Sequence, residues 1–482
     1  MTMAIGVLAV VGLLLLIFVY RPRQVNSAAR DEIDAWDARW LAARSCLVGD
    51  KPEAASLGQA FAIRELQHAV DVKKCKPLMK LWRNSNADSG LDDVEAAWKR
   101  MSVAVQKLND QYAVHNSNPA RADLKLPVAL DAVEGARGQL RTSAGMPVAP
   151  SLGPALQTAE VVSLANGKDP VVSLEPFVPS AHGGVAFGKT AAGSVEVVLT
   201  AGGAPLVATV VDGEVRSTAD FGFGALAEMG RIRIGKFDAF GAFAGEPQQI
   251  AMPGHVSVLV AAGTQAAGVV VYGIDAMVVA RRTAGADSFV SAKPVELANI
   301  ISTVDPVTNR AAIAWTDHAG KLSGQMVSAG DVIVDLGSTG DPQQMCLTAD
   351  RAYVMTTGAL VPFADTAQPS QLVANSTLRG CSPNAAVIQT VGVRDAFSVC
   401  SDTCRMVKLP DLPIDNATVV INRKLVAVAA HDGVIGLYRE DRPPSFVAAR
   451  VTGVVNAITD GKLIDVIAQT PEGLAIARIA SP

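Results

Sequence analysis

The chain has 482 residues, of which 49% are apolar and 18% are charged, and its formal net charge is −4. Such a length corresponds to about two to four domains, and the composition excludes a disordered chain, a collagen-like chain and a nucleic-acid-binding protein that works through bulk positive charge. Aromatic residues make up only 5% of the chain. Exposed aromatic platforms for carbohydrate are therefore not expected.

The N-terminal segment, residues 1–20, contains no charged residue. A helix over this segment is about 30 Å long, which matches the thickness of a bilayer core. The segment lacks the basic start of a signal peptide and continues directly into Arg21-Pro-Arg23. We therefore expect an uncleaved single-pass transmembrane anchor over residues 1–20. A cleaved signal peptide is the alternative.

Residues 24–142 are expected to form a small α-helical bundle. Two stripes of apolar residues have the spacing of one helical face. The first stripe is Ile33, Trp36, Trp40, Ala43 and Leu47, and the second is Leu91, Val94, Trp98, Met101, Val105, Leu108 and Tyr112. Weaker helical patterns cover residues 52–70 and 126–140. Helices joined by short polar loops favour an antiparallel bundle, although the stripes also fit a coiled coil with a partner.

A domain boundary is expected near residue 150. Residues 21–150 contain 19 Lys and Arg and 16 Asp and Glu, whereas the longer segment 151–482 contains 23 and 30. The density of charge thus falls sharply across this point. Residues 143–154 include Pro147, Pro150 and Pro154, so we interpret them as a stiff linker.

Residues 155–482 show repeated short β patterns instead of a helical period. Four units consist of a polar turn, a strand of about six residues, a second turn and another strand. These units begin at Asn309, Asp350, Asn422 and Asp460. A repeat of about 40 residues built from short antiparallel strands is typical of a propeller blade.

This region resembles the β-propeller superfamily in a general sense. None of the four units contains the Gly-His or Trp-Asp dipeptides that mark WD40 repeats, so the resemblance points to no specific family. It implies an all-β propeller-like domain of six or seven blades. Two β-sandwich domains are the alternative, and neither fold by itself indicates a function.

The six cysteines favour disulfide bonds. Cys400 and Cys404 flank a three-residue turn between two β patterns, which brings their sulfurs within bridging range. Cys46 and Cys75 lie near the ends of two expected helices, and their pairing leaves Cys346 with Cys381. The alternative is six free thiols in a reducing compartment. A zinc site is not expected, because no second close pair of ligands and no nearby histidine completes the Cys400–Cys404 spacing.

The cysteines also bear on localisation. Disulfides require an oxidising compartment, whereas Arg21, Arg23 and Arg30 follow the anchor and, by the positive-inside rule, favour a cytoplasmic domain. We give the disulfides more weight, because three arginines are a modest bias. The chain is expected in a bacterial inner membrane, with its large domain in the periplasm.

No pattern of catalytic or metal-ligating residues stands out. The six histidines are scattered, and His318 and His431 lie in polar hairpin turns of the β region. Equivalent turns of a propeller share one rim, so these two histidines are weak candidates for a ligand site, although turn residues of this kind are usually solvated. No cofactor, no metal and no catalytic residue is predicted, and nucleic acid is not an expected partner.

Three functional hypotheses remain. The architecture favours a membrane-anchored scaffold of the envelope that binds a protein partner through its propeller-like domain. An envelope hydrolase or lyase would need at least two carboxylates or an arginine cluster converging at the propeller axis. A small-ligand sensor would need an apolar pocket there.

Overall fold

The computed structural model divides the chain into two compact units, residues 1–156 and 157–482. The helical unit is described over residues 27–49, 54–67, 72–75, 91–117, 126–148 and 155–156. The second unit is described over residues 157–175, 183–209, 223–228, 231–236, 245–251, 257–262, 266–272, 276–283, 286–289, 293–294, 298–305, 310–326, 332–337, 340–373, 375–393, 395–409, 412, 418–422, 424–440, 442–460 and 462–480.

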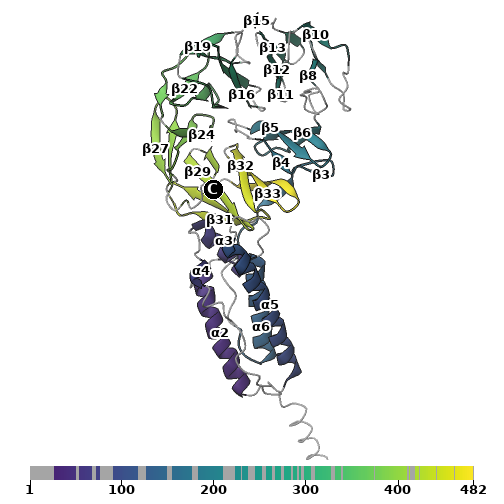
Figure 1. Cartoon of the computed structure of the whole chain (residues 1–482), viewed down its shortest axis with the longest axis vertical. Coiled ribbons are helices and arrows are strands. Elements are labelled where there is room, and N and C mark those ends of the chain that lie inside the picture. The colour runs from purple at the N-terminus through teal and green to yellow at the C-terminus, as the bar shows by residue number, and fades with distance from the viewer. Residues whose placement is uncertain are drawn as a thin grey trace, which may run out of the picture. The chain divides into compact units, whose positions relative to one another are not determined.

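The described elements of the first unit are helices. Its helices are α2 (Ser27–Val48), α3 (Leu57–Gln67), α4 (Val72–Cys75), α5 (Asp92–Ser117) and α6 (Leu126–Ser143) (Figure 1). Three acidic residues in the first turn of α5 favour a helix start there, because they complement the positive end of the helix dipole. The N-terminal helix predicted over residues 1–20 lies outside the described residues. No helix among the described residues is both long and apolar enough to cross a membrane.

Both predicted apolar stripes form the core of the helical unit. Trp36 and Trp40 of α2 are buried and stacked, and the ring of Trp98 from α5 meets Trp36 edge-on. Helix α5 packs along α6. Gly58 of α3 permits a close approach to α6, because an added Cβ would lie 2.7 Å from the carbonyl oxygen of Pro127. Other helices of the same chain thus cover the two apolar stripes.

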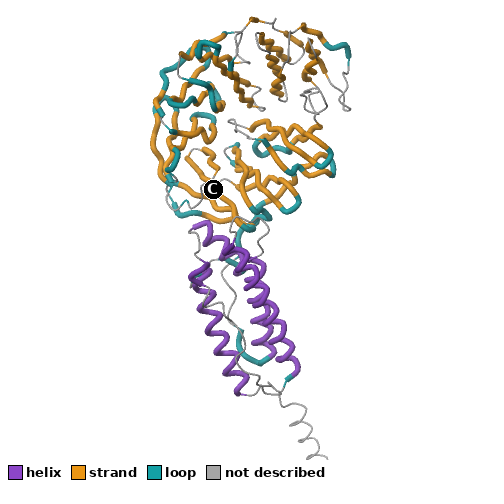
Figure 2. The backbone as a smooth tube through the Cα atoms, viewed as in Figure 1, coloured by secondary structure: helices purple, strands orange, loops and turns teal. Residues whose placement is uncertain are grey.

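The second unit is built from small antiparallel sheets arranged around a centre (Figures 1 and 2). Six of these sheets have four strands. In five of them the strands follow one another in chain order. The first contains β4 (Ser173–Leu174), β5 (Gly183–Thr190), β6 (Gly193–Thr200) and β7 (Leu206–Thr209), and the next contains β16 (Asn299–Asp305), β17 (Arg310–Thr316), β18 (Leu322–Met326) and β19 (Ile333–Gly337).

The other three sheets of this kind follow directly along the chain. They are β20 (Gln344–Leu347), β21 (Ala352–Met355), β22 (Ala359–Phe363) and β23 (Gln371–Leu372); β24 (Ser376–Cys381), β25 (Ala386–Thr390), β26 (Ala396–Cys400) and β27 (Cys404–Lys408); and β28 (Thr418–Asn422), β29 (Lys424–His431), β30 (Val434–Arg439) and β31 (Ser445–Ala448).

The sixth four-stranded sheet joins the two ends of the unit, and we call it the closing sheet. It consists of β32 (Gly453–Thr459), β33 (Leu463–Thr470) and β34 (Gly473–Ala480), with β1 (Glu160–Ser163) added alongside β34. The segment just before β1 also forms backbone hydrogen bonds with Ala448 of β31. The chain entering this unit therefore ties the closing sheet to the sheet that precedes it.

Two further sheets lie between β7 and β16 in the chain. One contains β8 (Phe223–Glu228), β9 (Arg231–Lys236) and β10 (Gln248–Ala251), and the other contains β11 (Ser257–Ala262), β12 (Ala266–Tyr272), β13 (Ala276–Thr283), β14 (Ala286–Phe289) and β15 (Lys293–Pro294). A separate short hairpin pairs β2 (Ala165–Asn166) with β3 (Asp169–Pro170).

The first strands of successive sheets contact one another, as the inner strands of a propeller do. Such contacts join β16 to β20, β20 to β24, β24 to β28 and β28 to β32, and β16 also contacts β5. Over its described residues, the unit is therefore a β-propeller with six four-stranded blades. The predicted propeller is confirmed, and the alternative of two β-sandwiches is wrong.

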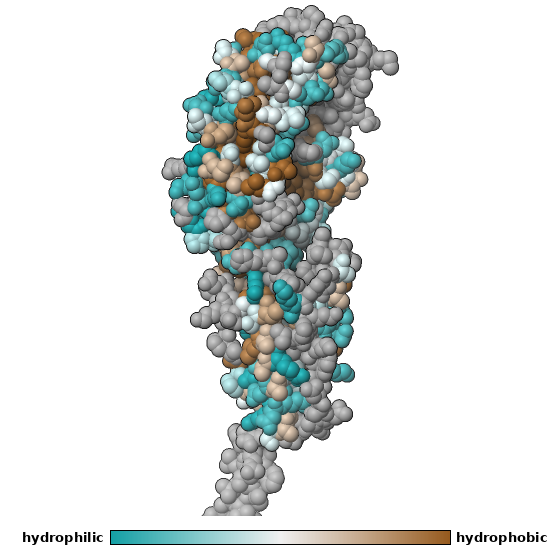
Figure 3. Space-filling model, turned by 60° about the vertical axis from the view of Figure 1, so that its left-hand side comes forward, coloured by the Kyte–Doolittle hydropathy of each residue, from teal (hydrophilic) through white to brown (hydrophobic). Residues whose placement is uncertain are grey.

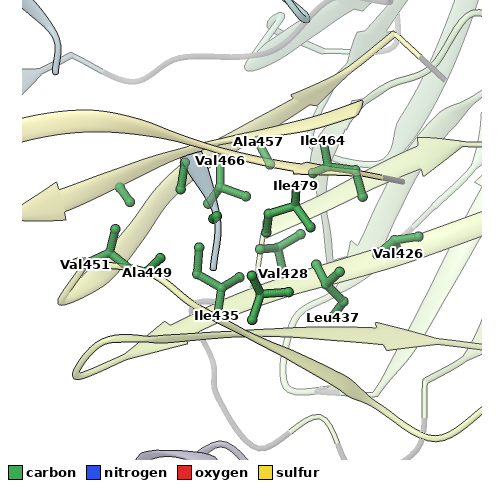
Figure 4. Close-up of a cluster of buried hydrophobic side chains, with 14 residues drawn as sticks. Val426, Val428, Ile435, Leu437, Ala449, Val451, Ala457, Ile464, Val466 and Ile479 are labelled. Carbon is green, nitrogen blue, oxygen red and sulfur yellow. The ribbon is translucent and has the colours of Figure 1, made fainter. Parts of the chain in front are cut away.

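The seams between blades are filled by aliphatic side chains. Figure 4 shows the seam between the β28–β31 sheet and the closing sheet, where side chains such as Val428, Ile435 and Leu437 face Val466 and Ile479. The strands here are almost continuously apolar because each blade is covered on both faces. This packing explains why the region is rich in Val, Ile and Ala yet poor in aromatic residues.

Candidate functional site

Arginines at the starts of second strands reach across blade seams. Arg310, the first residue of β17, donates to the carbonyl oxygens of Thr348 and Ala349 in the turn of the next blade. Arg351, just before β21, donates to Asp350 (2.8 Å) and to Asp402 of the following blade (3.0 Å). Arg310 and Arg351 are the second residues of two of the repeated sequence units. Their role is thus to join successive blades.

The seam between the closing sheet and the β4–β7 sheet, which we call the closing seam, contains a buried ion pair. Asp465 of β33 has a fully buried side chain and accepts a hydrogen bond from Arg478 Nε of β34 (3.1 Å) and another from the Gly202 backbone N–H (2.9 Å). Arg478 also donates to the carbonyl oxygen of Gly203. Burial raises the pKa of Asp465, although these bonds act against the rise. This cluster joins the β4–β7 sheet to the closing sheet.

The structure joins all six cysteines in disulfides, which confirms the prediction of disulfide bonding. The pairs are Cys46–Cys75, Cys346–Cys381 and Cys400–Cys404. Cys346 of β20 and Cys381 of β24 link the first strands of neighbouring blades, with their Cα atoms 5.7 Å apart. Cys400 and Cys404 are register partners in one hairpin. Two of the three disulfides therefore reinforce the β20–β23 and β24–β27 sheets.

The two histidine candidates are not brought together. His318 lies in the turn between β17 and β18, and His431 ends β29. Both turns connect second to third strands, but the β20–β23 and β24–β27 blades come between them in the ring. His431 Nε2 instead lies 3.5 Å from a carboxylate oxygen of Asp432, the next residue.

The inner strands do not present a set of converging charges. Across the first strands of the six four-stranded blades, Asp305 is the single carboxylate and Arg379 the single cation. Within the described residues, no group of three or more His, Cys, Asp or Glu side chains could hold a metal ion. An axial hydrolase of the expected kind needs two carboxylates or several arginines, and these strands do not supply them.

Four exposed apolar side chains lie in the strands and turns of the β20–β23 and β24–β27 sheets. We call this set the apolar rim, and it consists of Leu372, Val391, Val393 and Met406. Leu372 of β23 is 90% exposed and Met406 of β27 is 69% exposed. Figure 3 turns this side of the propeller forward and shows hydrophobic residues among hydrophilic ones at its surface.

Hydrogen bonds connect the elements that carry the apolar rim. Gln371, which precedes Leu372, donates to the carbonyl oxygen of Asp402 just before β27 (3.2 Å). The backbone N–H of Val391 donates to the carbonyl oxygen of Asn375, three residues after Leu372 (2.7 Å). These bonds show that the chain segments carrying the rim residues connect two neighbouring blades. The sequence alone does not reveal these residues, because single apolar residues in short strands and turns form no periodic pattern.

Comparison with known proteins assigns no family. No protein family matches the sequence, and no curated protein matches it. Among solved structures, the chain is similar to the WD40 domain of SCAP from fission yeast, with 8% identity and a TM-score of 0.39, over 67% of this chain and 98% of that one. It is also similar to Sqt1 of Saccharomyces cerevisiae, with 12% identity and a TM-score of 0.39, over 68% of this chain and 100% of that one. Such distant similarity adds nothing to the fold assignment, which rests on the sheet topology.

Proposed function

We propose that this protein is a membrane-anchored scaffold of the bacterial envelope, whose propeller binds a protein partner through the apolar rim. The observation that carries the proposal is the exposure of Leu372 and Met406 on two blades that disulfides reinforce. Large apolar side chains in water are costly unless a partner covers them, and grouped ones mark interaction surfaces. A rigid scaffold also lowers the entropy cost of binding.

The proposed location follows from the disulfides and the N-terminal segment. Three disulfides are consistent with an oxidising compartment, and the uncharged residues 1–20 are long enough for a single span. We therefore place the anchor in the inner membrane and the propeller in the periplasm. Thiol labelling of the denatured full chain tests this location. Labelling that requires prior reduction supports it, and labelling of all six cysteines without reductant contradicts it.

The binding proposal is tested by affinity purification of the full chain from detergent-solubilised membranes. Leu372→Asp and Met406→Asp place a charge in the apolar rim. The matched control is Val172→Asp, because Val172 is 58% exposed but lies next to β4, in another blade. A protein that copurifies with the wild type and with the control, but not with the two rim variants, supports the proposal. Equal recovery by all variants, or recovery of the chain alone, contradicts it.

A further inference from the structure

The inner strand of the β24–β27 blade contains a β-bulge at Arg379. Leu378 pairs with Ile388, whereas Gly380 pairs with Val387, so Arg379 has no partner residue on β25. Gly380 has a φ of 152°, which glycine adopts readily. A bulge bends its strand and redirects a side chain, and bulges are common beside binding sites. The backbone therefore sets the direction of Arg379 locally.

The guanidinium of Arg379 is held in place by a neutral side chain. Its Nε donates to Gln389 Oε1 (2.8 Å), and the Gln389 amide donates in turn to the carbonyl oxygen of Val393 (2.8 Å). Gln389 is itself buried, so its orientation is fixed. No carboxylate among the described residues pairs with Arg379, and the terminal nitrogens of its guanidinium have no acceptor there.

This arrangement differs from that of several other arginines in the chain. Arg137, Arg351, Arg405 and Arg478 each pair with a carboxylate. Arg379 is partly buried, and burial lowers its pKa, with no opposing negative charge among the described residues. A partly desolvated cation without a counterion is costly, and a ligand anion would relieve that cost.

We infer that Arg379 is the receptor for a carboxylate group of the protein partner, with the planar fork of its terminal nitrogens binding the two carboxylate oxygens. Two parallel hydrogen bonds to a carboxylate match the geometry of a guanidinium. This inference rests on the proposed function for the source of the carboxylate. Val393, whose carbonyl oxygen holds Gln389, also belongs to the apolar rim, so the receptor and the rim adjoin.

The receptor is tested on the full chain with sodium succinate as the carboxylate probe, at an ionic strength matched with sodium chloride. We expect succinate to raise the melting temperature of the wild type by about 1–3 °C, as for a ligand with a dissociation constant well below its working concentration. Arg379→Gln should abolish the shift, and Arg379→Lys should reduce it because lysine lacks the fork. The control is Arg405→Gln, which removes an exposed arginine of β27 that is already paired with Glu440. This variant should keep the shift.

Each outcome decides the inference. A shift that is equal in all variants, or absent from the wild type, overturns it, and so does a shift given by inorganic phosphate but not by succinate. If Arg379→Gln does not fold, Arg379→Lys and the wild type still give the comparison. Copurification of the partner separates this inference from the proposed function. Partner recovery unaffected by Arg379→Gln refutes the receptor alone, whereas a succinate shift without any partner refutes the scaffold alone.

Discussion

The helical unit and the propeller hold their buried charges in different ways. In the helical unit, Arg137 of α6 is nearly inaccessible and binds both Asp37 of α2 and Glu134. Glu134 also accepts a hydrogen bond from the Trp40 indole (2.7 Å). In the propeller, separate ion pairs join one blade to the next. One unit thus depends on a single central network, whereas the other distributes its ionic contacts along a ring.

The largest effect is expected from removal of the centre of the helical network. Arg137→Met removes the most buried cation of this network. Asp37 still has Arg141 (3.1 Å) and Glu134 still has Arg44 (3.4 Å), but breaking the buried pair of Arg137 and Asp37 should lower the free energy of unfolding of the helical unit by about 3–5 kcal/mol. Urea unfolding followed by tryptophan fluorescence measures it, because Trp36, Trp40 and Trp98 lie in this unit. Asp34→Asn is the control, since the Asp34 side chain is 61% exposed. Similar midpoints for both variants would show that the network is not central.

The next effect concerns the disulfides of the propeller. Cys346 and Cys381 are 35 residues apart and Cys400 and Cys404 are 4 apart. In the chain-entropy description, replacing the first pair by alanine should cost about 4 kcal/mol and replacing the second about 2 kcal/mol. Circular dichroism in the β region during urea unfolding gives both values. A larger loss of stability from replacing Cys400 and Cys404 than from replacing Cys346 and Cys381 would contradict the assumption that loop length determines how much each disulfide stabilises the propeller.

A smaller effect is expected from the titration of the closing seam. The raised pKa of Asp465 means that the folded state holds this proton more tightly than the unfolded state does, so its contribution to stability should fall as pH rises from about 4 through the folded pKa. Asp465→Asn removes this slope. Melting temperatures of both proteins across this range measure it.

Asp350 should make stability depend on pH in the opposite direction. Burial opposes its ionisation, but the hydrogen bonds from Arg351 and Thr348 prevail and lower its pKa. Its contribution should therefore be present above the unfolded pKa of about 4 and be lost as pH falls through the lower folded value. Asp350→Asn and Asp465→Asn should change the pH profile in opposite directions. Parallel changes would contradict the assignment of the two environments.

The smallest effect is expected at an exposed ion pair of the propeller. Lys321, just before β18, and Asp335 of β19 lie 2.8 Å apart, and both side chains are at least half exposed. Solvent screens such a pair, so Lys321→Ala should leave the melting temperature unchanged within error. A measurable loss would show that exposed pairs also hold the blades together.

Local patterns accounted for much of the fold. The stripe through Trp36 and Trp40 is buried as its spacing predicted, and the four repeated β units correspond to second and third strands of blades. Those strands are long and regular enough to be recognised. The two-residue strands β4 and β23 are too short to leave a pattern, and neither they nor the joining of β1 to β34 could be foreseen.

The candidate sites were less accessible to sequence reasoning. Asp37 and Arg137 are 100 positions apart, and Asp465 meets Gly202 from the opposite end of the propeller unit. Such pairs depend on tertiary structure and have no local signature. Arg379 could not be distinguished from other arginines, because its character comes from a bulge and from the lack of a carboxylate among its described neighbours.

The pairing of β1 with β34 in the closing sheet has a consequence for how the protein folds during synthesis. Among the described strands of the propeller unit, β1 is synthesised first and its partner β34 last. Until then, the edges of both strands have unpaired backbone groups, which can pair with another chain. Synthesis of this unit must therefore reach β34 before the ring can close, and a factor that shields β1 in the interval would raise the yield of correctly folded protein.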